Sequence, residues 1–204
     1  DGTVERVGCA ALVLASCGFG GNPELVAEFV PDMAQAIYFG HAGNTGNAVL
    51  WGRALGVDCR DMGSFQGHGS VATPQAITVS WALLTGGGLL INADGLRFAD
   101  ESQGASELSA VVCRQPGGFV WTVIDERLHM GALRFADYQA LQELGAIRTG
   151  ANPAELAQAC DLPVQAFESA LTGADKQPAL QAPFYAIKVT GALLQTQGGL
   201  AIDA

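Results

Sequence analysis

Residues 9–22, C-A-A-L-V-L-A-S-C-G-F-G-G-N, carry the strongest information about the architecture. The first seven form a continuous apolar run, which predicts a strand buried on both faces. A glycine-rich turn follows, and Pro23 then begins a predicted short helix that extends to about Phe29. This layout is typical of a nucleotide-contacting βα unit, although an ordinary tight connection has the same pattern.

The complete dinucleotide-binding fingerprint is absent from the chain. Gly18 and Gly20 fit the pattern G-x-G-x-x-G, but Pro23 occupies the place of its last glycine. The turn therefore points towards a nucleotide without establishing that it binds one.

The overall composition is that of a folded, acidic protein. The chain has 204 residues, 49% of them hydrophobic, 15% charged and 27 of them glycine, with a formal net charge of −10. These values predict a sizeable core with tight backbone turns. The acidic balance argues against nucleic-acid binding, and the longest stretch free of charged residues, 62–93, is too polar for membrane insertion.

Cysteine and histidine spacing bears on the compartment and on metals. The five cysteines include no C-x-x-C pair and the three histidines are scattered, which argues against a disulfide framework and against a metal site. We expect a reducing, cytoplasmic compartment. The chain opens at Asp1 without methionine or a basic leader, so we expect an excised or processed fragment.

The rest of the chain predicts an α+β protein. Thr45 or Asn44 is expected to cap a helix, and exposed N–H groups at that helix start could receive an anion. Asp94-Gly95 predicts a hairpin turn, and Asn152 with Glu155 predicts a helix start. The expected helices are 48–55, 106–114, 137–144, one from Asn152 and one from Asp161 to about Gly173; the expected strands are 77–81, 89–92, 119–124 and runs within 184–203; 174–183 is expected to be a linker.

Five strings in order resemble the succinate dehydrogenase/fumarate reductase flavoprotein family, which includes tricarballylate and 3-ketosteroid dehydrogenases. They are V-L-A-S-C-G-F-G-G-N (13–22), N-T-G-N-A (44–48), Q-G-H (66–68), L-I-N-A-D-G-L-R-F-A-D-E (90–101), and P-F-Y-A (183–186) with T-Q-G-G-L-A-I-D (196–203). The resemblance implies the middle of an FAD-dependent oxidoreductase. Residues 1–62 and 183–204 would belong to an α/β flavin domain, truncated at its end, and 63–182 to an inserted α+β capping domain.

The resemblance also implies a set of FAD contacts. Small residues would be required there, because a larger side chain would block approach of the backbone to the cofactor. Asn47 stands where the family usually has aspartate. The implied contacts are Ala15, Ser16, Cys17 and Gly18, then Thr45, Gly46 and Asn47, and finally Thr196, Gly198 and Gly199.

His68 matches a substrate-contacting histidine of the family, and imidazole can polarise a carbonyl or carboxylate. A histidine that serves only structure is the alternative. Gln195 replaces the family's second substrate histidine and is the other catalytic candidate. Arg97 and Glu101 would border the substrate cleft, or would form an ion pair that shapes the hairpin.

The departures from the fumarate reductases bear on the substrate. Ser80-Trp81 replaces Thr-Glu, while Leu84 and Ala105 replace two arginines. A buried dicarboxylate needs fixed cations, so fumarate and succinate are not the expected substrates. Ser80 and Trp81 would instead contact a larger or more apolar molecule, unless Trp81 is a core residue.

The expected function is therefore hydride exchange between FAD and a C–C bond of a small organic substrate, with an unidentified electron partner. FAD is expected in the full-length protein and not in this chain alone. The alternative is a non-catalytic module with a cap-like fold that binds a small molecule or a partner.

Overall fold

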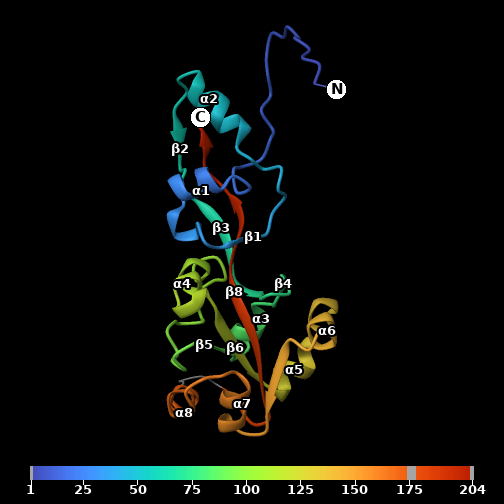
Figure 1. Cartoon of the computed structure of the whole chain (residues 1–204), viewed down its shortest axis with the longest axis vertical. Coiled ribbons are helices and arrows are strands. Elements are labelled where there is room, and N and C mark those ends of the chain that lie inside the picture. The colour runs from blue at the N-terminus through green and yellow to red at the C-terminus, as the bar shows by residue number, and fades with distance from the viewer. Residues whose placement is uncertain (1, 174–177, 203–204) are drawn as a thin grey trace.

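The computed structural model describes residues 2–173 and 178–202. The molecule is elongated, and both ends of the chain lie towards the end that carries α1 and α2 (Figure 1). The helices are α1 Pro23–Phe29, α2 Asn47–Ala54, α3 Ala82–Thr85, α4 Ser109–Cys113, α5 Glu126–Ala132, α6 Ala136–Glu143, α7 Pro153–Ala159 and α8 Val164–Thr172, with 3₁₀ turns at Pro31–Met33 and Pro116–Gly118. The strands are β1 Ile37–Tyr38, β2 Cys59–Arg60, β3 Phe65–Ala72, β4 Ile77–Thr78, β5 Leu89–Asn92, β6 Val120–Asp125, β7 Ile147–Gly150, β8 Phe184–Thr196 and β9 Gly199–Leu200.

The long strand β8 organises the main sheet. The strand order is β4-β3-β8-β6-β5, and β1 and β7 also pair with β8. One end of β8, at Phe184, pairs with Asp125 of β6, and the other end, at Thr196, pairs with Phe65 of β3. Because β8 runs through most of the length of the molecule (Figure 1), it connects the two ends directly.

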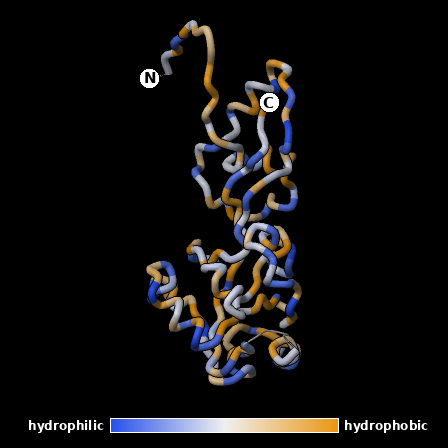
Figure 2. Tube along the Cα trace, turned by 180° about the vertical axis from the view of Figure 1, so that it is seen from behind, coloured by the Kyte–Doolittle hydropathy of each residue, from blue (hydrophilic) through white to orange (hydrophobic). Residues whose placement is uncertain are grey.

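Both faces of the sheet are buried where β5, β6 and β8 lie side by side. On β5, Leu90 packs into one apolar cluster with Ile124 and Ile187, whereas Ile91 packs into a second with Phe167. Figure 2 shows apolar and polar positions interspersed along the chain. Burial on both faces explains why 89–92 is apolar at consecutive positions.

A third apolar cluster lies in the half that carries α1 and α2. Phe19, Leu25, Met33 and Val49 pack there against Leu193 of β8. The cluster therefore fixes the glycine-rich turn and both helices to the far end of the long strand.

The strand predicted over 9–15 is wrong. These residues lie in an extended, exposed segment with no assigned strand, and Leu12 and Val13 are 72% and 86% exposed. A strand needs a neighbour to accept and donate its ladder hydrogen bonds, and no strand within 2–173 or 178–202 pairs with this run.

Two further expectations are corrected. The cap of α2 is Gly46, in a left-handed conformation with no side-chain hydrogen bond, and neither Thr45 nor Asn44 caps the helix. The strand expected over 77–81 ends at Thr78, because Trp81 already has helical dihedral angles as the N-cap of α3.

Other expectations are confirmed. The predicted helix from Pro23 to Phe29 has the observed bounds. Asn152 caps α7, since its Oδ1 accepts the Glu155 N–H and its Nδ2 donates to Glu155 Oε1. The linker predicted over 174–183 lies partly outside the described residues. Within the described part, no helix is long and apolar enough to cross a bilayer.

Candidate functional site

Three segments far apart in the sequence meet at one end of β8. The Phe19 N–H donates to Thr196 Oγ1 at 2.8 Å, and a Cβ added at Gly18 would lie 2.2 Å from the same oxygen. A Cβ on Gly46 would lie 2.7 Å from the Phe19 Cβ. The structure therefore brings together three predicted cofactor contacts, which we call the junction cluster: Gly18, Gly46 and Thr196.

This packing changes the explanation for one glycine. A small residue was expected at Gly18 to let a cofactor approach, but the Thr196 side chain fills the space beside it. Gly198 is similarly close to the protein itself, since a Cβ there would lie 2.4 Å from the Asp61 carbonyl oxygen. Protein packing is sufficient to require both glycines.

Other predicted contacts leave room for a bound group. A Cβ added at Gly199 would have no neighbouring atom within 4 Å. Ala15, Ser16 and Cys17 are exposed, and Cys17 adopts a left-handed backbone with φ of 61°. Asn47 is also exposed. These accessible positions next to the junction cluster fit a cofactor that lies against backbone and small side chains.

A second group of predicted residues lines one cavity of about 300 Å³, which we call the His68 cleft. His68 on β3 and Trp81 pack edge to face, with ring centroids 6.0 Å apart. Ser80 also lines the cleft, and Trp81 Nε1 donates to the Gln103 carbonyl at 3.1 Å, which holds the indole in place. The sequence predicted these three residues near a substrate, and the structure brings them together.

His68 is held as a neutral ring. Burial lowers the pKa of His68, and its Nδ1 accepts a hydrogen bond from the Ser70 N–H at 3.1 Å. An accepting Nδ1 leaves Nε2 as the protonated nitrogen of the neutral tautomer. The imidazole can therefore donate a hydrogen bond to an acceptor.

The charges around the cleft differ from those of an anion site. Asp137 is the acidic side chain among its described lining residues, and neither lysine nor arginine is among them. Leu84 does not line the cleft, as it is 1% exposed within the core.

Gln195 lies on the neighbouring strand. Its Nε2 donates to Gln66 Oε1 at 3.0 Å, and the two residues are directly paired between β8 and β3. Gln195 is exposed and does not line the His68 cleft.

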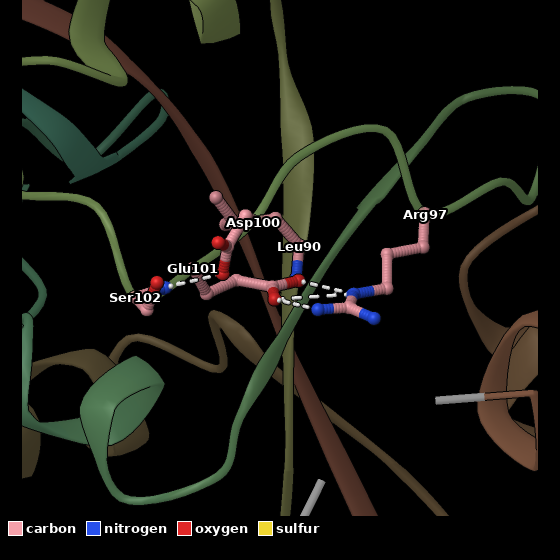
Figure 3. Close-up of polar contacts among 5 residues, drawn as sticks. All are labelled: Leu90, Arg97, Asp100, Glu101 and Ser102. Carbon is pink, nitrogen blue, oxygen red and sulfur yellow. Dashed lines mark hydrogen bonds and ion pairs between the residues drawn. The ribbon is translucent and has the colours of Figure 1, made fainter. Parts of the chain in front are cut away.

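Arg97 and Glu101 form an ion pair (Figure 3), and neither residue lines the His68 cleft. Arg97 Nη2 lies 2.6 Å from Glu101 Oε2, and its Nε also donates to the carboxylate. Glu101 is fully buried and accepts the Leu90 N–H of β5 at 3.0 Å. These contacts tie the chain after the hairpin to the central sheet.

A polar cluster around His129 is not indicated by any sequence motif. His129 Nδ1 lies 2.9 Å from the Tyr138 hydroxyl, and the His129 ring stacks on Tyr185 with centroids 4.0 Å apart. Burial lowers the pKa of His129 and raises that of Tyr138, while the hydrogen bond to Glu126 raises the pKa of Tyr185 to about 12. The four residues come from α5, α6 and β8 and share no motif, so no sequence spacing indicates the cluster.

Comparison with known proteins gives a consistent result. A family model described as FAD binding domain matches residues 1–204. A probable fumarate reductase, Ifc3, of Shewanella frigidimarina is 29% identical over 97% of this chain and 36% of its own length.

Two solved structures share the fold. The open conformation of a flavocytochrome c3 fumarate reductase matches with a TM-score of 0.73 and 25% identity, over 92% of this chain and 36% of that one. A 3-ketosteroid delta1-dehydrogenase from Sterolibacterium denitrificans matches with a TM-score of 0.70 and 18% identity, over 92% and 42%. The chain thus spans little more than a third of the length of these relatives.

Proposed function

Because the chain belongs to the FAD binding domain family, we propose that it is part of a flavoprotein oxidoreductase that exchanges hydride between FAD and a C–C bond of a small organic substrate. The observation that carries the proposal is that β8 joins the two candidate sites. Thr196 of the junction cluster and Ala192, which pairs with His68, lie four positions apart on this strand. At ~3.3 Å per residue that is about 13 Å.

The junction cluster and its neighbours would hold the cofactor. Gly199, with open space beside it, and the exposed backbone at Ser16 and Cys17 would lie against FAD. Thr45 and Asn47 at the start of α2 would contact it beside Gly46. When bound, FAD supplies the capacity to accept or donate hydride.

The His68 cleft would orient the substrate. The neutral His68 ring presents an N–H, and the Ser80 hydroxyl supplies a second donor, so both can hold an oxygen atom of the substrate. Trp81, fixed through Gln103, forms an apolar wall that helps to exclude water from the reacting bond. Gln195, which does not line the cleft, would contact the substrate from the neighbouring strand β8, where it is hydrogen-bonded to Gln66.

The proposed division of the chain follows from this arrangement. Residues 1–62 and 183–204 would form the flavin-domain portion, and 63–182 the capping domain that carries the His68 cleft. Arg97 and Glu101 would not contact the substrate themselves. Their ion pair would shape the hairpin that borders the substrate region. The unpaired cysteines favour a reducing, cytoplasmic location, and a separate electron partner would complete the reaction.

The substrate proposed here is not fumarate, although relatives bear that name. A dicarboxylate in a closed site needs cations to offset its charge, and the described lining of the His68 cleft offers Asp137 instead.

The test uses the full-length protein with its flavin reduced anaerobically. We expect no reoxidation by fumarate at the ~1–1000 per second typical of enzymes, and reoxidation by an uncharged α,β-unsaturated carbonyl compound. Turnover of fumarate at such a rate would refute the substrate class. A protein that purifies without flavin and takes up none would instead favour a non-catalytic binding module.

A further inference from the structure

Phe135 is an exposed aromatic residue with no evident structural role. Its side chain is 58% exposed, and it occupies the N-cap position of α6, where it makes no side-chain hydrogen bond. Serine, threonine, aspartate or asparagine at this position would stabilise the helix by ~1 kcal/mol. Phe135 provides neither a cap nor a buried core contact.

A second hollow also has Phe135 in its lining. It measures about 270 Å³, and Leu128 and Gly131 of α5 line it. The His68 cleft and this hollow share four lining residues: Ser80, Leu83, Ala132 and Phe135. We call the second space the outer hollow.

The volumes favour joint use of the two spaces. Ligand sites in proteins usually measure ~300–1,000 Å³. At about 300 Å³ the His68 cleft is at the lower limit of that range, and the outer hollow at about 270 Å³ is below it. A ligand that extends from one into the other would occupy a site of ordinary size.

We propose that the outer hollow is a subsite that receives an uncharged, apolar extension of the substrate, and that Phe135, which lines both spaces, is the residue against which this extension packs. The inference rests on the proposed function in one respect, namely that the His68 cleft holds the reacting end. The apolar extension would pass along the Phe135 ring into the space above Leu128.

The charges near the outer hollow support an uncharged occupant. Arg127 contributes to the lining, but its guanidinium donates to the Gly86 carbonyl at 3.0 Å and lies 3.8 Å from the Asp125 carboxylate. The guanidinium is thus already engaged, and the other lining residues are mostly apolar. An alkyl or ring extension matches such a surface better than a carboxylate does.

Gly131 provides a way to fill the outer hollow without disturbing the fold. A Cβ at this position would have no atom within 4 Å, and Gly131 lines the outer hollow but not the His68 cleft. Leucine also has a better helix propensity than glycine. Gly131→Leu should therefore fold and occupy the proposed subsite.

The experiment measures binding of straight-chain methyl ketones, from butanone to decanone, to this chain. The Trp81 indole N–H resonance, assigned by the loss of its signal in Trp81→Phe, reports binding in the His68 cleft. We expect affinity to rise about fourfold for each methylene buried, corresponding to ~0.8 kcal/mol, and to level off once the outer hollow is full.

The variants separate the subsite from general hydrophobicity. Gly131→Leu should abolish the gain for long ketones and leave butanone binding unchanged, and Phe135→Ala should reduce the gain per methylene. Met130→Ala is the matched control, since Met130 is 57% exposed on the same helix and lines neither space.

Equal affinity across the series, an unchanged series in Gly131→Leu, or no binding of any ketone up to its solubility limit would each overturn the subsite. The proposed function is judged separately, from flavin content and reoxidation of the full-length protein, so the two failures are distinguishable.

Discussion

Glu101 shows how a residue expected near a substrate can instead stabilise the fold. Its carboxylate is fully buried, receives the Leu90 N–H, and pairs with Arg97 through more than one hydrogen bond. Removing one member of a buried ion pair is strongly destabilising, at ~3–5 kcal/mol. We therefore expect Glu101→Gln to lower the free energy of unfolding, measured with urea, by about that amount.

The chain contains a matched control for Glu101. Glu28 pairs with Arg53 at 3.1 Å, but both side chains are nearly half exposed. Glu28→Gln should lower the free energy of unfolding far less than Glu101→Gln does, because solvent screens an exposed ion pair. If Glu101→Gln were as mild as Glu28→Gln, the pair would not hold the hairpin to the sheet, and a role in substrate binding would regain support.

His68 can be tested in the same way for catalysis. If its Nε2–H donates to an oxygen on which charge develops, His68→Gln in the full-length enzyme should lower kcat by ~100- to 1000-fold, or ~2.7–4 kcal/mol. Melting temperature and steady-state kinetics are measured on one preparation. A lowered melting temperature with unchanged turnover of the folded fraction would show that His68 takes no part in the reaction. The Ser80 hydroxyl would then remain as the hydrogen-bond donor to the substrate.

Helices were more predictable from the sequence than strands, because their signals are local. The Asn152 cap and the helix from Pro23 depend on residues within one turn, and both are confirmed. The apolar run at 9–15 specifies a strand only if a neighbour is present, and none pairs with it among the described residues.

Strand β3 was missed for a related reason. Residues 65–72 include two glycines and a histidine and show no alternation of apolar and polar residues. The strand is stabilised instead by its pairing with β8 and by α4, which packs closely against its glycines. In the same way, motifs indicated His68, Ser80 and Trp81, whereas Asp137 and Tyr138 reach the cleft only through the packing of α6.

The contact between the glycine-rich turn and β8 gives a prediction about how these elements are joined. A methyl group on Gly18 would clash with both the side chain and the carbonyl oxygen of Thr196. Such overpacking costs ~1–3 kcal/mol, so Gly18→Ala should lower the melting temperature by ~2–4 °C for each kcal/mol lost. Gly199→Ala, with open space at the added methyl, is the control and should leave it unchanged. Equal melting temperatures for the two variants would contradict the packing described.

Considered as a whole, the molecule would carry one side of the proposed cofactor site at one end of the long strand β8. Close packing and the hydrogen bond from the Phe19 N–H to Thr196 hold the three residues of the junction cluster together. The neighbouring residues Ser16 and Cys17 are exposed. The G-x-G-x-x-G turn that binds the pyrophosphate of dinucleotides is not in this chain.

The last prediction follows from that division. The chain of 204 residues, purified alone, should be colourless and lack tight FAD binding, because without the pyrophosphate-binding turn the FAD phosphates lack the helix N-terminus that would offset their charge. Flavin absorbance per protein, measured after FAD addition and gel filtration, checks this. The full-length protein should retain flavin under the same conditions, and Gly199→Leu in it should reduce the retained fraction while the melting temperature of the flavin-free form stays constant, since the added side chain enters open space. Near-stoichiometric flavin on the chain alone would show that the junction cluster and its neighbours hold FAD without the pyrophosphate turn.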